Sequence, residues 1–125
     1  MSRLSNILNK LAVNSIVDTG TSSGWSWRKY ADGTAEMWKL SITNQACGTA
    51  LGSAYRTANA CVENFPFTFQ EAPICNATPG NGQLHGVYFA NVGVGQLQWY
   101  AIKLTKETQA SEKPVELHVI GKLAT

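Results

Sequence analysis

Apolar and polar positions alternate most clearly over residues 24–40, where two aromatic-rich runs flank Asp32-Gly33. An Asp-Gly pair favours a two-residue type I′ turn, because that turn needs positive φ at both central positions. On the resulting register Trp27 lies opposite Trp38, and the intervening residues point to the other face. The pattern therefore predicts a β-hairpin with one core face, formed by Trp25, Trp27, Trp38 and Leu40.

Short apolar runs between turn residues continue to the C-terminus. Residues 65–69 carry three phenylalanines at alternate positions, and Pro66 restricts such a strand to a sheet edge or a strand start. Trp99 and Tyr100 put large rings on both faces of one run, which is typical of a strand that is central or has its second face covered by a neighbour. Further strands are expected at 41–44, around 55, and at 73–78, 84–92, 96–104 and from 115 onward. In the last run, alternation places Val115, Leu117 and Val119 inward and Glu116, His118 and Lys122 outward. Strands at this spacing predict an all-β fold, an antiparallel β-sandwich or barrel of jelly-roll type.

Leucine and isoleucine recur at helical spacing near the N-terminus. This stripe, within residues 3–14, consists of Leu4, Ile7, Leu8 and Leu11. A helix of about three turns is marginal alone in water, so the stripe must pack on the domain or on copies of itself. Residues 18–24 are expected to form a flexible connector. The predicted organisation is a docking or oligomer-forming helix over 1–17 and a single β-domain over 18–125.

The composition disfavours several classes of function. The net charge is +2 and charged residues make up 14% of the chain. The basic residues form no stripe that could follow a phosphate backbone, so nucleic-acid binding is not expected. No apolar run approaches the ~20 residues of a membrane helix, and no membrane insertion is expected. Asn6, Asn9 and Lys10 interrupt the N-terminal apolar positions, so no signal peptide is expected.

Residues that commonly carry chemistry are few. Cys47, Cys61 and Cys75 include no C-x-x-C pair, which disfavours both a zinc site and a disulfide framework. Free buried thiols in a reduced compartment are the expected state. The two histidines, His85 and His118, lack the spacing of metal ligands. The sequence thus motivates no catalytic residue, no metal site and no cofactor.

The aromatic motifs resemble those of the C-terminal domain of phage and prophage tail proteins. The matching runs are Trp25-x-Trp27-Arg28-Lys29-Tyr30-x-x-Gly33-x-x-Glu36-x-Trp38, then Phe65-Pro66-Phe67-x-Phe69, then Trp99-Tyr100-Ala101-Ile102. The resemblance covers about residues 18–123, in the same order. It implies a β-sandwich or barrel head at a tail tip or fibre end, usually a homotrimer, that meets the host surface. It also implies a virion protein assembled in the bacterial host cytoplasm, whose N-terminal stripe resembles the helix through which such heads associate.

Saccharide recognition suits this composition, because a sugar site needs ring faces and fixed hydrogen-bonding groups. The candidate ligand-binding residues are Tyr55, Arg56, Asn81, His85 and Trp99. Two hypotheses follow. The first is a non-enzymatic homotrimeric head that binds a host cell-surface saccharide and gains strength from multivalency. The second is a purely structural tail or baseplate component whose exposed rings contact other virion proteins.

Overall fold

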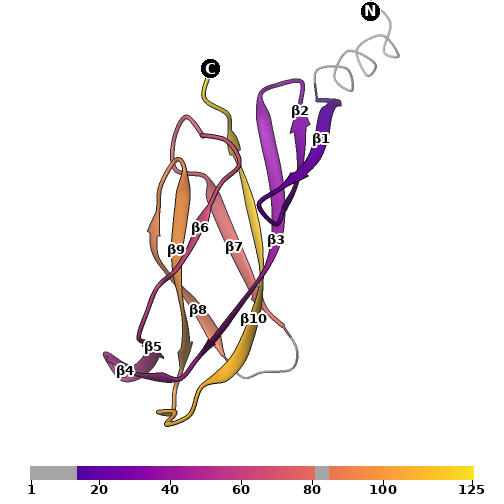
Figure 1. Cartoon of the computed structure of the whole chain (residues 1–125). Helices are drawn as coiled ribbons and strands as arrows, with labels where there is room; N and C mark the ends of the chain where they lie inside the picture. The colour runs from indigo at the N-terminus through magenta and orange to yellow at the C-terminus, as the bar shows by residue number, and fades with distance from the viewer. Residues whose placement is uncertain (1–13, 81–84) are drawn as a thin grey trace, which may run out of the picture.

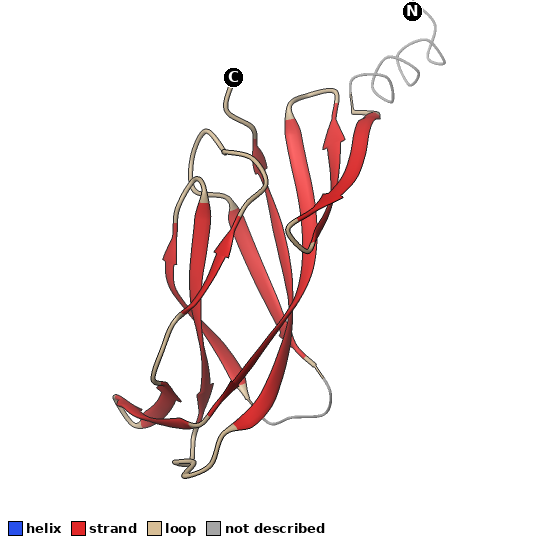
Figure 2. Ribbon diagram, viewed as in Figure 1, coloured by secondary structure: helices blue, strands red, loops and turns tan. Residues whose placement is uncertain are grey.

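Two antiparallel β-sheets packed face to face make up the molecule (Figure 1, Figure 2). The computed structural model describes residues 14–80 and 85–125 of the chain. The first sheet has the strand order β1-β2-β3-β10-β7, and the second has the order β4-β5-β9-β6, with β8 also paired to β9. The described residues include no helix. The predicted all-β sandwich is confirmed.

The strand bounds show how the chain moves between the sheets. The first sheet contains β1 (Ile16–Ser22), β2 (Trp25–Tyr30), β3 (Thr34–Gln45), β7 (Ile74–Pro79) and β10 (Ser111–Lys122). The second contains β4 (Cys47–Leu51), β5 (Ala54–Thr57), β6 (Cys61–Asn64), β8 (Gly86–Val92) and β9 (Gln96–Lys103). The chain therefore starts in the first sheet, crosses to the second after β3, and returns for β7 and again for β10.

The core lies between the sheets and is filled by alternate residues of the central strands. The buried positions are Leu97, Trp99 and Ala101 in β9 and Val115, Leu117 and Val119 in β10. Since β9 pairs with β5, β6 and β8, the prediction of a central strand is confirmed. The predicted faces of the last strand are confirmed as well, because Glu116 and Lys122 are exposed.

The loop of the β2–β3 hairpin differs from the predicted two-residue turn. The N–H of Gly33 donates to the carbonyl of Tyr30 at 3.0 Å, and Gly33 has a φ of +88°. A turn closed in this way, followed by a left-handed glycine, is the usual three-residue hairpin loop. The longer loop shifts the strand pairing by one residue, so that Trp27 lies opposite Met37.

This shift moves two of the four predicted core residues to the outer face of the first sheet, because side chains alternate along a strand. Trp38 lies opposite Ser26 on that face, and Leu40 is 59% exposed. The predicted core positions of Trp38 and Leu40 are therefore wrong. Trp25 is fully buried and Trp27 packs against the core, as predicted.

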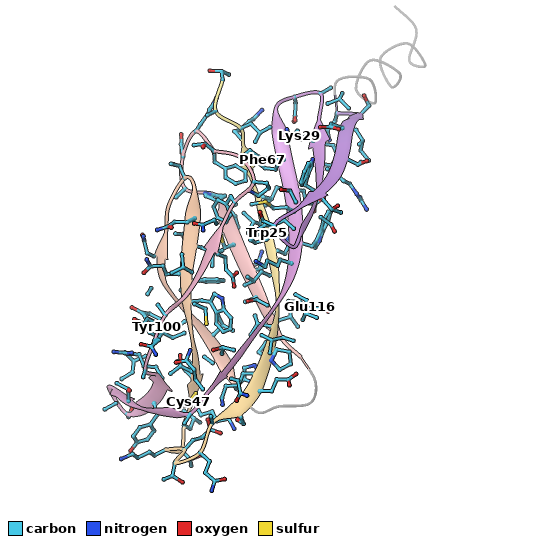
Figure 3. The ribbon with its side chains drawn as sticks, in the orientation of Figure 1. Trp25, Lys29, Cys47, Phe67, Tyr100 and Glu116 are labelled. Atoms are coloured by element: carbon cyan, nitrogen blue, oxygen red, sulfur yellow. The ribbon has the colours of Figure 1, made fainter. Side chains whose placement is uncertain are left out.

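The phenylalanine run 65–69 forms a loop and not the predicted edge strand. Its rings pack edge-on against the hairpin indoles, Phe65 against Trp25 and Phe67 against Trp27. Figure 3 shows Trp25 and Phe67 at the same end of the sandwich. The alternation of the run thus arises from aromatic packing across the sheets, which needs no ladder of backbone hydrogen bonds.

The segment 18–24, predicted as a flexible connector, instead belongs largely to the edge strand β1, which pairs with β2. The sheet therefore begins at Ile16. Gly20 pairs with Trp27 of β2, and a Cβ at Gly20 would lie 2.5 Å from the Trp27 ring. A larger residue at this position would displace the indole, so the strand needs glycine here.

The remaining sequence predictions concern the N-terminal stripe, membrane insertion and the cysteines. The stripe formed by Leu4, Ile7, Leu8 and Leu11 lies outside the described residues. Within those described, no helix is long and apolar enough to cross a membrane.

Cys47, Cys61 and Cys75 are free thiols, as predicted. Burial raises the pKa of each, that of Cys75 to about 11, so they stay protonated at neutral pH.

Candidate functional site

The outer face of the first sheet carries an aromatic centre around Trp38, which we call the Trp38 face. Strand pairing places Trp38 between Ser26 of β2 and His118 of β10. The guanidinium carbon of Arg28 lies 5.0 Å from the centroid of the Trp38 ring. The His118 ring lies 5.6 Å from the same ring, tilted by 32°. Three adjacent strands thus hold one indole between a guanidinium and an imidazole.

A fixed carboxylate supports this centre. The hydroxyl of Tyr30 donates to Glu36 Oε1 at 2.9 Å, and His118 Nε2 donates to Glu36 Oε2 at 2.8 Å. Burial would raise the pKa of Glu36, but the hydrogen bonds from His118 and Tyr30 outweigh it and lower the pKa below its usual value. Glu36 is therefore ionised at neutral pH, and it fixes the orientation of the imidazole beside Trp38.

Two shallow grooves flank the indole. The first, which we call the Arg28 groove, has a volume of about 400 Å³ and is lined by Thr19, Gly20, Thr21, Ser26, Trp27, Arg28 and Trp38. The second, the His118 groove, has a volume of about 350 Å³ and is lined by Gly24, Ser26, Trp38, Lys39, Leu40, Thr78, Glu116, Leu117 and His118. Because Trp38 and Ser26 line both, the indole forms the ridge between them. Hydroxyl groups are available on either side of that ridge.

The Trp38 face carries side chains of the kinds that ligand recognition uses. An indole flanked by hydroxyls, a cation and a fixed acid can stack on a ligand ring and bond its polar groups. Retaining or inverting glycosidases need two facing carboxyl groups, whereas Glu36 is already bonded to His118 and Tyr30. Among residues 14–80 and 85–125, no group of three His, Cys, Asp or Glu side chains is gathered to hold a metal ion.

Two of the sequence-predicted ligand residues are buried. Trp99 is fully buried, and its indole N–H donates to Glu63 Oε2 at 2.8 Å. Its ring is part of the core, so its prediction as a ligand platform is wrong. His85 is 8% exposed, and its Nε2 lies 3.1 Å from the carbonyl of Pro114. Burial lowers the pKa of His85, which favours the neutral imidazole.

The other predicted ligand residues belong to the second sheet or lie outside the described residues. Tyr55 is half-buried and packs against the core. Arg56 lies on the outer face, its guanidinium carbon 4.5 Å from the Tyr100 ring centroid, and Tyr100 stacks on Tyr88. Asn81 lies outside the described residues. The structure therefore does not bring Tyr55 or Arg56 to the Trp38 face, and Figure 3 shows Tyr100 and Glu116 on opposite outer sides of the sandwich.

The sequence prediction missed the Trp38 face because of the hairpin loop. A three-residue loop over 31–33, ending in a left-handed glycine, is as compatible with Asp32-Gly33 as a two-residue turn is. That alternative would have placed Trp38 and Arg28 together on the outer face. The composition of the run contained a signal, since the two-residue turn placed the acidic Glu36 on the same face as Trp25 and Trp27, whereas the longer loop places it on the outer face opposite Arg28.

The fold is that of the C-terminal region of a tail fibre. The chain is structurally similar to the N-truncated R1-type pyocin tail fibre, with a TM-score of 0.58 and 14% identity, over 97% of this chain and 98% of that chain. It is also similar to the P. aeruginosa R1 pyocin fibre comprising C-terminal residues 323–701, with a TM-score of 0.59 and 13% identity. That alignment covers 97% of this chain and 32% of the fibre fragment. No protein-family model and no curated protein sequence matches the chain.

Proposed function

We propose that this chain is a non-enzymatic head domain of a phage or pyocin-like tail fibre, and that it binds a host cell-surface saccharide at the Trp38 face. The observation that carries the proposal is the half-buried indole between two hydroxyl-lined grooves. The fold supports the assignment to a tail fibre, because both similar structures are tail fibres. The protein would then be a virion component at the tail tip or fibre end, assembled in the bacterial host cytoplasm.

Replacing Trp38 by alanine tests the saccharide proposal. Loss of the stacking surface is expected to weaken binding to saccharides on a glycan array by roughly tenfold or more, because an aromatic contact contributes about 0.5–1.5 kcal/mol beyond its buried area. Tyr88→Ala is the matched control, since Tyr88 is an exposed ring on the opposite sheet. Circular dichroism and a melting curve establish that both variants fold.

The outcomes separate the Trp38 face from other surfaces. Binding that is lost in Trp38→Ala and kept in Tyr88→Ala supports the proposal. Binding that survives Trp38→Ala, or is lost in Tyr88→Ala, assigns the ligand to another surface. No binding by the native chain to any saccharide contradicts the proposed function.

A structural role within the tail is the second candidate, and exposed apolar residues favour it. Leu40, Ile42 and Ile74 are 59%, 52% and 67% exposed, and all three belong to strands of the first sheet. Exposed apolar side chains of this size suit contact with another protein. Tight binding to another tail protein, together with no saccharide binding, would favour this candidate.

We further propose that the chain works as a homotrimer, since three linked sites raise the strength of a weak saccharide contact. Light scattering after size exclusion is expected to give three times the chain mass of 13.5 kDa. Deleting residues 1–13 leaves β1 intact, because β1 begins at Ile16. A smaller assembly after this deletion would place the oligomer seam in the N-terminal stripe, while a monomeric native chain would contradict the proposed trimer.

A further inference from the structure

Arg28 is an exposed cation of the Trp38 face that forms no direct ion pair with another described residue. Among the residues that the structure describes, its guanidinium makes no ion pair or hydrogen bond, and its contact is the cation–π approach to Trp38. Arg56, the other stacked arginine, differs because it donates to the carbonyls of Thr57 and Ala58. The hydrogen-bond donors of Arg28 are therefore free to engage a ligand.

Glu36 is close enough for the charge of Arg28 to contribute to its lowered pKa, but the two side chains form no ion pair. Glu36 lies opposite Arg28 across the hairpin, but one of its oxygens accepts from Tyr30 and the other from His118. That carboxylate therefore bridges Tyr30 of β2 and His118 of β10, and both of its oxygens are already bonded. The guanidinium lines the groove on the β1 side, together with residues of β1 and β2.

The two grooves differ in the charged residues that line them. The Arg28 groove has hydroxyls from Thr19, Thr21 and Ser26 and no acidic residue. The His118 groove contains Glu116, whose side chain is exposed, and Lys39, whose ammonium is already paired with Glu63 at 3.0 Å. An anion placed in the Arg28 groove would meet a free guanidinium and hydroxyl donors, whereas in the other groove it would meet a carboxylate.

We infer that Arg28 binds an anionic substituent of the saccharide, a carboxylate or a phosphate, and that the Trp38 face therefore prefers acidic saccharides to neutral ones. This inference rests on the proposed saccharide function and names the class of its ligand. The ligand ring stacks at Trp38, its anionic group lies in the Arg28 groove, and its neutral hydroxyls extend toward the His118 groove. The planar fork of a guanidinium suits both carboxylate and phosphate oxygens.

The test compares matched charged and uncharged probes on the full-length chain. Oligogalacturonate is paired with its methyl ester, which keeps the rings and removes the charge, and phosphorylated oligomannose is paired with its dephosphorylated form. The native chain is expected to bind one charged member roughly 10–100-fold more tightly than its partner, the range for a charge-assisted hydrogen bond. The favoured pair distinguishes carboxylate from phosphate.

Variants at the two stacked arginines locate the selectivity. Arg28→Gln is expected to abolish the preference for the charged probe, and Arg28→Lys, which keeps the charge and loses the fork, to keep part of it. Arg56→Gln, on the second sheet, is expected to retain it fully. Equal binding of both probes by the native chain, or a preference that survives Arg28→Gln, overturns the inference.

The failure of this inference differs from failure of the proposed function. If neutral and charged probes bind equally and Trp38→Ala abolishes both, the saccharide site stands and the acidic preference is wrong. If none of the four probes binds, the acidic preference is wrong, and the saccharide function is decided separately by the glycan array. A preference lost in Arg56→Gln in place of Arg28→Gln would move the acidic site to the second sheet and overturn the inference.

Discussion

Replacing Glu107 by glutamine is expected to lower the free energy of unfolding by about 3 kcal/mol, and the melting temperature by roughly 10 °C. Glu107 Oε1 lies 2.8 Å from the ammonium of Lys113, whose side chain is completely buried. Glu107 also accepts from Lys103 at 2.9 Å and from the N–H of Cys47 at 2.9 Å. Without the carboxylate of Glu107, the buried ammonium of Lys113 has no counter-charge, and the cost of leaving that charge unpaired accounts for most of the expected loss of stability.

Urea unfolding of Glu107→Gln measures this effect, and Glu112→Gln is the matched control. Glu112 is adjacent to Lys113 in sequence but exposed, so its neutralisation is expected to change the free energy of unfolding by less than about 0.5 kcal/mol. Equal stability of the two variants would show that Lys113 does not need Glu107, because the carbonyl of Gln45 and the hydroxyl of Ser111, both 2.6 Å away, would then suffice.

The same carboxylate predicts a loss of stability in acid. Burial would raise the pKa of Glu107, but hydrogen bonds from Lys113, the Cys47 N–H and Lys103 outweigh it and lower the pKa to about 2, from an ordinary value of 4.5. Because the folded-state pKa is the lower one, the stabilisation is complete above the ordinary value and is lost as the pH falls from about 5 toward 2. Glu107→Gln is expected to show a shallower decline in the free energy of unfolding over this range.

The architecture could be predicted from the sequence because local alternation decides it. Val115, Leu117 and Val119 alternate with polar residues along β10, and burial on one face of an antiparallel sheet requires that pattern. The large rings of Trp99 and Tyr100 likewise indicated a central strand. In both strands, the residues themselves carry the information about sheet position.

The register of the hairpin could not be fixed in the same way. Residues 31–33 close a three-residue loop, whereas the same Asp-Gly pair also suits a two-residue turn, and the two loops differ by one residue of pairing. The two registers differ in which of Met37 and Trp38 is buried, and the structure buries Met37 fully, a choice that a local pattern does not contain. The face on which Trp38 lies depends on this one-residue shift in strand pairing, and the shorter turn therefore led to the prediction of Trp38 in the core.

The role of Trp99 was hidden for a related reason. An indole on a strand with large rings on both faces fits either the core or a ligand platform, and the choice depends on which face meets the other sheet. Here the inner face carries a carboxylate, Glu63, that accepts the Trp99 N–H. The pairing of β6 with β9 sets the two side chains near each other, and no sequence motif indicates that contact.

Replacing Glu63 by leucine is expected to lower the free energy of unfolding by about 3–5 kcal/mol. Glu63 is 5% exposed and lies in the second sheet. Its carboxylate accepts from Trp99 in its own sheet and from Ser41 in the first sheet, and pairs with Lys39 of the first sheet at 3.0 Å. The substitution leaves a buried indole N–H and a largely buried ammonium without an acceptor.

A double-mutant cycle in urea identifies the cause of that loss. If the unpaired indole N–H contributes, Trp99→Phe should cost less in the Glu63→Leu background than in the native chain, with a coupling of roughly 1–3 kcal/mol. Glu71→Leu, at an exposed position in the loop before β7, is the control for loss of an acidic residue. Additive losses at Glu63 and Trp99 would contradict the predicted link, and the inter-sheet contribution of Glu63 would then rest on Lys39 and Ser41 alone.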